Sequence, residues 1–384
     1  MLPIKVPPIG VLILAAPRAD LGLSLLSPVI TILWDDFSAS ADLAQPVLSA
    51  FMVSLAISQL ISEPLSDRFD RKKILHSGTV IFIVGGIGAL LSTTIDMLIG
   101  FRTLQGAGTA AYMTMGRVIV NDVYQGVEAA RTLSIVSSAQ AIVPPIEFAF
   151  GGVIAEFIGW RGGIGIMAMG GLLIAFMSYL FVGESRSGDP VLFRPAPLIN
   201  AYLALLKTSG VMFHGLTSGL AVGMFFAMGG AMPHAFDRVG IGPLKYGLFF
   251  ASTSIGFILG NFINGLPVEQ VGVAWIAYLG SLLTALVPML MLAGDLTSLL
   301  TLLLLSFLCF SFGVCNRLVI ANAMIYSIRA ICSMRAAGRN SGVGTGLLGT
   351  MQMLFGGVVV SAIIALGGAD YFSVTAIGLL IITR

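Results

Sequence analysis

Charged residues are scarce in this sequence. Asp, Glu, Lys and Arg make up 10% of its 384 residues, whereas soluble domains carry about 25%. This scarcity excludes an ordinary soluble protein, and the formal net charge of +2 provides no basic surface for nucleic acid. Disorder is also excluded, because a chain with 57% hydrophobic residues must bury its surface. The composition therefore predicts an all-α membrane protein that crosses the lipid bilayer several times.

Cysteine and histidine are scarce too, with three residues of each. Cys309, Cys315 and Cys332 cannot form a paired disulfide framework and belong to no redox motif. The histidines lack the spacing of metal ligands. Because the sequence contains no nucleophile–base or metal constellation, we expect no enzyme activity, no cofactor and no bound metal.

The sequence contains many long apolar runs. A spanning helix needs about 20 apolar residues, and twelve runs are candidates, although the last is short enough to be tilted, shallow or incomplete. They lie at about 9–34, 44–65, 74–94, 97–121, 132–156, 162–183, 210–233, 245–264, 273–293, 297–322, 341–366 and 371–384.

The longest polar stretch, Glu184 to Lys207, lies between the sixth and seventh runs and contains three prolines. It divides the chain into an N-terminal six-helix half (1–183), a cytoplasmic linker (184–209) and a C-terminal six-helix half (210–384). Within it, Leu198–Leu206 forms either a short amphipathic surface helix or a plain linker. Two parallel halves predict a substrate site at their interface near the middle of the membrane.

The distribution of Lys and Arg predicts the orientation. With the N-terminus inside, thirteen of the 20 fall on cytoplasmic segments, three fall outside and four lie within spans. Because cytoplasmic loops carry the excess of positive residues, both termini are predicted to be cytoplasmic.

Several motifs resemble those of a known family. Residues 63–75 (EPLSDRFDRKKIL) resemble the G-x-L-a-D-R-x-G-R-R/K-x-x-L loop signature of the major facilitator superfamily. Residues 98–108 (LIGFRTLQGAG) are similar to the drug:proton antiporter signature l-x-x-x-R-x-x-q-G-x-g. The segments 121–131 (NDVYQGVEAAR) and 183–185 (GES) resemble the bicyclomycin/chloramphenicol-resistance branch. The resemblance implies a major facilitator fold, alternating access, and export of small molecules driven by inward proton flow.

Four positions depart from the family pattern. Glu63 and Asp70 replace two glycines of the loop signature. Phe148 replaces the second proline of the fifth-span motif, and Ser24 stands where the family has a first-span acid.

The loop signature holds Asp67, Arg68 and Arg71. One interpretation is a solvated topology anchor. The other, which the resemblance favours, is a latch in which Asp67 faces the N-terminal end of a later helix and Arg71 pairs with an acid such as Asp122, so that one state is held closed. Arg131 is assigned to the same gating group.

Charges within the predicted spans are the candidates for the transport site, since each costs about 2.5–3.5 kcal/mol at the centre of a spanning helix. Glu147 lies near the middle of the fifth run and Asp20 near the middle of the first. Low-dielectric surroundings favour the protonated form of a carboxyl group, so both are candidate proton carriers, Glu147 first. Arg18 faces away from Asp20 and belongs either to this site or to a buried ion pair.

Three further arginines are candidates for proton coupling or substrate binding. Arg102 lies in the antiporter signature, where the resemblance implies proton transfer or tuning of a nearby acid; its alternative is a snorkelling residue near the outer end of the fourth span. Arg117 either faces the inner cavity or pairs with Asp122. Arg317 either contacts substrate or stabilises the inner gate.

Small and cyclic residues surround Glu147 along the fifth run. Pro144 and Pro145 precede it, and Gly151 and Gly152 follow it. They either loosen the backbone for bending during transport or permit close packing of a neighbouring helix.

We therefore expect a monomeric, proton-coupled exporter of small amphipathic compounds or drugs in the bacterial inner membrane. The alternatives are a metabolite or siderophore exporter, an uncoupled facilitator of the same fold, and, from another class, a membrane sensor or scaffold that does not transport.

Overall fold

The structure is a computed structural model. It describes residues 22–37, 46–124, 126–185, 195–238, 240–265, 273–297, 299, 301–335 and 341–365. Within these ranges the regular structure is entirely helical. The twelfth predicted span and residues Arg18 and Asp20 of the first lie outside the described residues.

The helices follow the order of the predicted spans. The earlier ones are α5 (Pro46–Arg68), α6 (Arg71–Leu90), α7 (Ile95–Val123), α8 (Gly126–Phe157) and α9 (Trp160–Phe181). The later ones are α11 (Ser209–Arg238), α12 (Pro243–Gly265), α14 (Val273–Leu296), α15 (Leu302–Arg335) and α16 (Ser341–Ala365). Most ends agree with the prediction to within several residues, but α15 continues well past the end predicted at residue 322.

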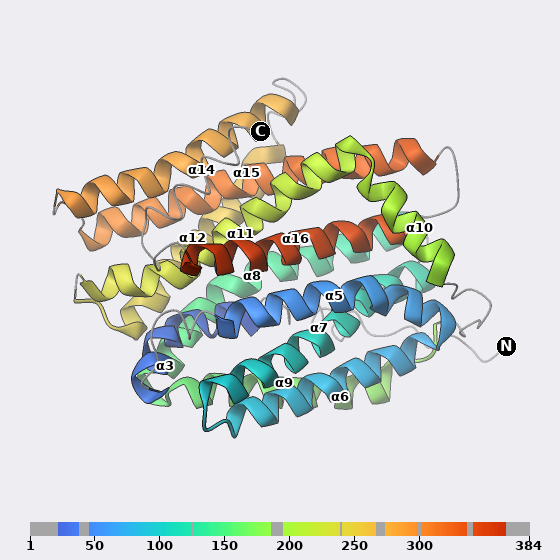
Figure 1. The fold of residues 1–384 in the computed structure, drawn as a ribbon, viewed down its shortest axis with the longest axis horizontal. Coiled ribbons are helices and arrows are strands. Elements are labelled where there is room, and N and C mark those ends of the chain that lie inside the picture. The colour runs from blue at the N-terminus through green and yellow to red at the C-terminus, as the bar shows by residue number, and fades with distance from the viewer. Residues whose placement is uncertain are drawn as a thin grey trace.

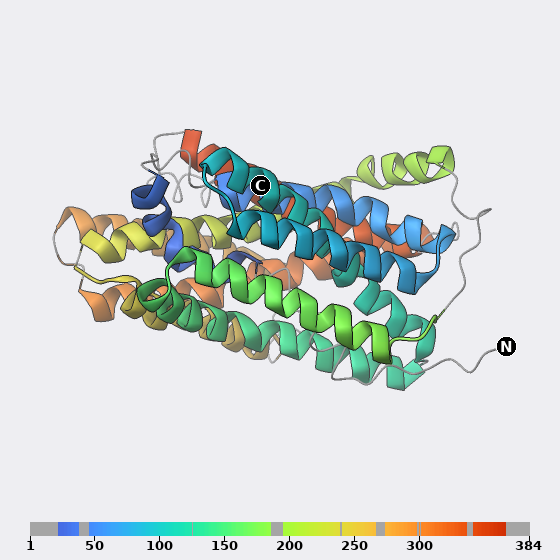
Figure 2. The same cartoon turned by 90° about the horizontal axis from the view of Figure 1, so that it is seen from below.

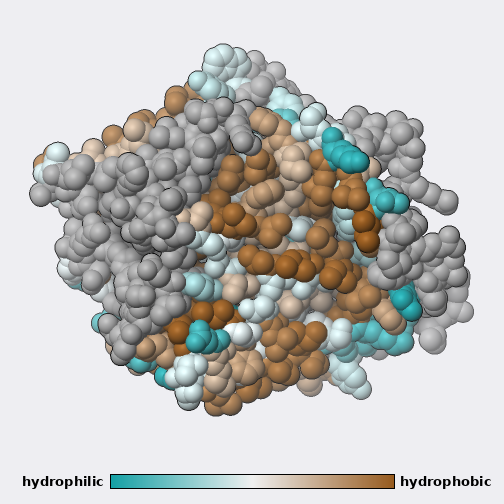
Figure 3. Space-filling model, in the orientation of Figure 1, coloured by the Kyte–Doolittle hydropathy of each residue, from teal (hydrophilic) through white to brown (hydrophobic). Residues whose placement is uncertain are grey.

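Many of these helices are suited to a membrane. Among the described residues, α5, α6, α9, α11, α12 and α15 contain the six that are long and apolar enough to cross one. Large apolar side chains such as Phe157, Met169 and Phe262 are exposed, as expected where lipid is the solvent. Apolar residues cover much of the middle of the face in Figure 3, and hydrophilic residues lie towards its edges. The total of twelve spans stays a prediction.

The long helices lie side by side in a bundle (Figures 1 and 2). In the earlier part of the chain, α7 packs against α5 and α6, and α6 packs against α9. In the later part, α15 packs against α11, α12 and α14, and α11 packs against α16. The two sets meet along two helix pairs, α8 with α12 and α5 with α16.

The first predicted span is not a continuous helix in its described part. A helical segment at residues 22–24 leads into a turn, the 3₁₀ helix η1 (Ser27–Val29) and then α3 (Ile30–Phe37). Pro28 explains the break, because its ring clashes with the preceding turn and it has no N–H to donate. The span predicted at about 9–34 is thus interrupted at residues 25–29, where the structure has a turn and a 3₁₀ helix.

The polar stretch between the two sets contains helix α10 (Pro195–Leu206). Of the two alternatives predicted for this stretch, the short helix is therefore correct and the plain linker is not. It lies at one end of the bundle (Figure 1). The hydroxyl of Tyr202 donates to the carbonyl oxygen of Leu60 on α5 over 3.0 Å, and Leu205 is buried. This helix is therefore attached to the bundle rather than free of it.

Glycines allow α12 and α15 to approach closely. A Cβ atom at Gly313 would lie 1.8 Å from the carbonyl oxygen of Thr253, and one at Gly256 would lie 2.1 Å from the carbonyl oxygen of Phe310. Neither acceptor is a flexible side chain, so the helices themselves must separate if a larger residue is introduced.

We expect Gly313→Val to lower the free energy of unfolding by about 1–3 kcal/mol, because the added atoms push α12 and α15 apart. The measurement is the melting temperature of the purified protein in detergent. Gly116→Val on α7 is the matched control, since a Cβ there meets nothing within 4 Å. Equal melting temperatures for the two variants would contradict this packing.

Candidate functional site

Glu147 lies on α8, where this helix meets α12. Its side chain is only 4% exposed. The next residue, Phe148, makes an edge-to-face contact with Phe250 of α12, with ring centroids 4.8 Å apart. Glu147 is therefore a buried acid on α8, one residue before a contact with α12.

The glycines that follow Glu147 are contact points. A Cβ atom at Gly151 would lie 2.8 Å from the carbonyl oxygen of Leu25, and a Cβ at Gly247 of α12 would lie 2.9 Å from the Cα of Gly152. Both observations support the close-packing interpretation of this pair. Pro144 and Pro145 lie within α8, which stays helical through them.

Arg102 of α7 is fully buried, with 0% of its surface exposed. Its guanidinium carbon lies 4.3 Å from the ring centroid of Phe51 on α5. The same group donates hydrogen bonds to the carbonyl oxygen of Gly22 and to the side-chain oxygen of Gln105. The snorkelling alternative is therefore wrong: this cation joins α7 to α5 and to the segment before η1, and it does not reach the surface.

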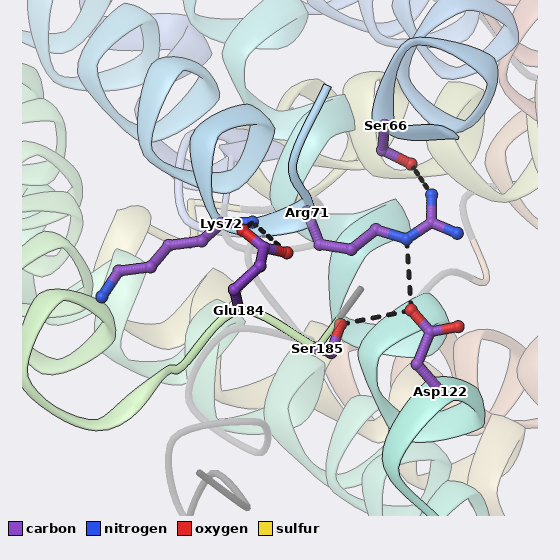
Figure 4. Close-up of polar contacts among 6 residues, drawn as sticks. All are labelled: Ser66, Arg71, Lys72, Asp122, Glu184 and Ser185. Atoms are coloured by element: carbon purple, nitrogen blue, oxygen red, sulfur yellow. Dashed lines mark hydrogen bonds and ion pairs between the residues drawn. The ribbon is translucent and has the colours of Figure 1, made fainter. Parts of the chain in front are cut away.

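Arg71, at the start of α6, forms the ion pair predicted from the sequence. Its Nε atom lies 3.1 Å from an Oδ2 atom of Asp122 on α7. Nη1 donates to the hydroxyl of Ser66, and the hydroxyl of Ser185 donates to the same Asp122 oxygen over 3.2 Å. Figure 4 shows Arg71 extended between Ser66 and Asp122. The group fastens the ends of α5, α6 and α7 to the segment after α9.

Glu184 lies beside this group and caps α6. Its two carboxylate oxygens accept from the backbone N–H of Lys72, over 3.4 and 3.2 Å, as suits an anion at a helix N-terminus. The Lys72 side chain points away from Arg71 (Figure 4) and donates to the carbonyl oxygen of Tyr179 over 3.3 Å. Sequence reasoning assigned no role to Ser66, Glu184 or Ser185, although the Gly183-Glu184-Ser185 motif was a signal for two of them.

Arg68 and Arg131 are the remaining gating candidates whose side chains the structure describes. Arg68 is exposed, with its guanidinium carbon 5.3 Å from the Phe69 ring centroid. Arg131 is exposed on α8. Asp67 and Arg117 belong to α5 and α7, and their side chains lie outside the described part of the structure.

Arg317 lies on α15 and is half-buried. Its Nε donates to the side-chain oxygen of Asn261 on α12, and its guanidinium carbon lies 4.8 Å from the ring centroid of Phe257, also on α12. The neighbouring Asn316 is fully buried and donates to the carbonyl oxygen of Ala221 on α11 over 2.9 Å. The structure thus places Arg317 among α11, α12 and α15, far along the chain from the other candidates.

A family model described as Major Facilitator Superfamily matches residues 14–361. The chain belongs to this superfamily. It is therefore a multi-pass membrane transporter of small molecules and not an enzyme, and the resemblance stated from the sequence is confirmed.

Curated relatives of this major facilitator protein include resistance proteins. The bicyclomycin resistance protein homolog of Haemophilus influenzae is 24% identical over 365 residues, which cover 92% of this chain and 87% of that protein. The chloramphenicol resistance protein of Pseudomonas aeruginosa is 25% identical over 257 residues, which cover 66% and 60%. These names agree with the branch that the sequence motifs indicated.

Solved transporters share the fold. The bacterial homolog of the human lysosomal transporter Spinster, in an inward-facing and occupied conformation, superimposes with a TM-score of 0.73 at 15% identity, over 98% of this chain and 94% of that one. The xylose transporter XylE from E. coli gives 0.73 at 14% identity, over 98% and 95%. At such identities the likeness establishes the shared architecture.

The ion pair between Arg71 and Asp122 should be worth more than the exposed pair of Lys73 with Asp70, whose atoms lie 2.6 Å apart at the protein surface. In a double-mutant cycle with Arg71→Ala and Asp122→Asn, we expect a coupling energy of about 1–3 kcal/mol in the free energy of unfolding. The cycle with Lys73→Ala and Asp70→Asn should give at most about 0.5 kcal/mol. The measurement is chemical unfolding in detergent, and equal coupling energies would refute a special role for the buried pair.

Proposed function

We propose that this protein is a proton-coupled efflux transporter, which exports small amphipathic compounds or drugs across the bacterial inner membrane by alternating access. The observation that carries the proposal is the burial of Glu147 on α8 at its contact with α12. An ionisable residue inside a spanning bundle is a candidate functional group by default, since its burial is costly.

The position of Glu147 suggests how a proton would be exchanged. Its neighbour Phe148 contacts α12 through its ring and through its carbonyl oxygen, which a Cβ at Gly247 would meet at 2.4 Å. Any rocking of α12 against α8 therefore changes the surroundings of the carboxyl group. A buried carboxyl group favours its protonated form, and hydration or an approaching cation favours the ionised form. One acid with two such environments is sufficient to couple proton and substrate movement.

The other membrane charges complete this proposal. Arg102, held against Phe51 and the Gly22 carbonyl, supplies a fixed positive charge that links the first span to α5 and α7. Asp20 is the second candidate proton carrier, and we assign Arg18, two residues before it on the same span, to this site or to an ion pair with a group on another helix. Arg117 stays a candidate for the inner cavity.

At the cytoplasmic end, we assign a gating role to the loop after α5. Arg71 and Asp122 connect neighbouring helices of the N-terminal half, so they brace a platform rather than bridge the two halves. Asp67 on that platform is the residue proposed to face the N-terminus of a helix in the C-terminal half. Arg68 and Arg131 supply positive charge to the same surface.

The topology belongs to the same proposal. We assign residues 1–183 and 210–384 to two six-helix halves joined by a cytoplasmic linker at 184–209, with both termini in the cytoplasm and a monomer as the working unit. The contacts of α8 with α12 and of α5 with α16 are the helix pairs along which these halves would rock.

The test is transport in proteoliposomes with chloramphenicol as the probe. An imposed proton gradient should drive uphill movement of chloramphenicol by the wild type, and Glu147→Gln should abolish it, because an amide cannot release a proton. Chloramphenicol exchange without a gradient should persist in this variant, because the substrate path remains.

Glu156→Gln is the matched control, since Glu156 is an exposed acid on the same helix; its uphill transport should equal that of the wild type. Undiminished uphill transport by Glu147→Gln would eliminate Glu147 as the proton carrier. A wild-type rate that ignores the gradient would eliminate the antiport proposal itself.

A further inference from the structure

Arg317 carries a positive charge within the apolar span of α15. No carboxylate lies within ion-pair distance of it in the described part of the chain, where its contacts are with Asn261 and Phe257. Lys and Arg inside membrane helices are normally paired or serve a transported ligand. A charge that has no counter-ion among the described residues is suited to receive one from a bound ligand.

The local geometry leaves one edge of the guanidinium available. Nε is used by the Asn261 oxygen. Nη1 and Nη2 make no hydrogen bond within the described residues. Neither atom is fully buried, and the residue as a whole is half-buried, so a ligand can reach them. Two parallel N–H groups on one planar edge match the two oxygens of a carboxylate, sulfonate or phosphate.

Aromatic side chains provide the apolar part of the site. The Phe257 ring lies under the guanidinium and is 5.6 Å, centroid to centroid, from Phe225 on α11. Phe226 in turn lies 5.5 Å from Phe225. All three phenylalanines are partly buried. They offer an aromatic surface next to a single positive charge.

The depth of Arg317 argues against a lipid headgroup as the anion. The apolar span of α15 is Leu302–Ser327. Arg317 lies fifteen residues after its start and ten before its end, which at 1.5 Å per residue is about 22 Å and about 15 Å. Headgroups lie near the ends of spanning helices, so a mobile solute is the better match.

From these observations we propose that Arg317, oriented by Asn261 and backed by Phe257 and Phe225, binds the anionic group of the transported compound. The substrates of this protein would then include amphipathic organic anions with an aromatic body. This inference rests on the proposed efflux function and adds a substrate class to it.

A pair of probes that differ in one charged group tests the proposal. 1-Anilinonaphthalene-8-sulfonate and N-phenyl-1-naphthylamine share one aromatic scaffold, and only the former carries a sulfonate. Their binding to the full-length protein in phosphatidylcholine nanodiscs is measured by equilibrium dialysis against empty nanodiscs. For Arg317→Gln we expect the Kd of the sulfonate to rise about tenfold or more and that of the neutral probe to stay unchanged. Arg317→Lys should give an intermediate Kd, because a point charge remains without the planar edge.

Two further variants guard against a general loss of structure. Lys245→Gln removes one positive charge from an exposed position on α12 and should alter neither Kd. Asn261→Ala retains the Arg317 charge but removes the side chain that orients it, so it should weaken binding of the sulfonate and leave binding of the neutral probe unchanged. If Arg317→Gln does not fold, the proposal is tested with Asn261→Ala instead. Equal changes for both probes, or a sulfonate Kd that does not depend on Arg317, would overturn the proposal.

Two additional measurements distinguish a substrate site from a lipid site and from a failure of the efflux proposal. If phosphatidylglycerol added to the nanodiscs removes the Arg317-dependent sulfonate binding, the site holds a lipid headgroup and the substrate assignment is wrong. Proton-driven chloramphenicol transport by the wild type is scored separately. Its absence would reject the efflux function while leaving the charge selectivity of Arg317 as an independent result.

Discussion

The cost of placing a charge in the hydrocarbon layer is the constraint on which this structure depends. Lipid cannot solvate an ion, so the protein itself must surround each charged side chain that lies within the membrane. Arg102 meets this requirement with a phenylalanine ring, a backbone carbonyl and a glutamine. Arg317 uses an asparagine and a phenylalanine, and Glu147 is buried on α8 one residue before Phe148 contacts α12. Each of these charges therefore lies where helices meet, and movement between helices changes its surroundings.

Close helix contacts and an ion pair hold the helices together within each set. α12 and α15 approach so closely at Gly256 and Gly313 that a single methyl group would separate them, and Arg71 and Asp122 tie the start of α6 to the end of α7. These contacts make each helix set a coherent body. The aromatic contact of Phe148 with Phe250 joins the two sets at α8 and α12, and the hydroxyl of Thr350 on α16 donates to the carbonyl oxygen of Ala56 on α5 over 3.2 Å.

Much of this arrangement could be predicted from the sequence, because a spanning helix is specified by a continuous run of apolar residues. The apolar runs predicted the helices from α5 to α16 in the correct order, and the loop signature predicted the pair of Arg71 with Asp122. The burial of Arg102 could not be predicted, since it depends on Gly22, eighty residues earlier, reaching the side of α7. Glu184 at the N-terminus of α6 is likewise a contact between distant segments. The break after residue 24 had a local signal in Pro28, which the apolar character of its neighbours concealed.

The central claim is that Glu147 releases a proton when substrate binds. The most direct measurement is the pH change in a weakly buffered detergent solution of the purified protein on addition of chloramphenicol, followed with a pH indicator dye. The account predicts an acidification by the wild type that saturates with chloramphenicol and is absent from Glu147→Gln. An equal acidification by both proteins would contradict it.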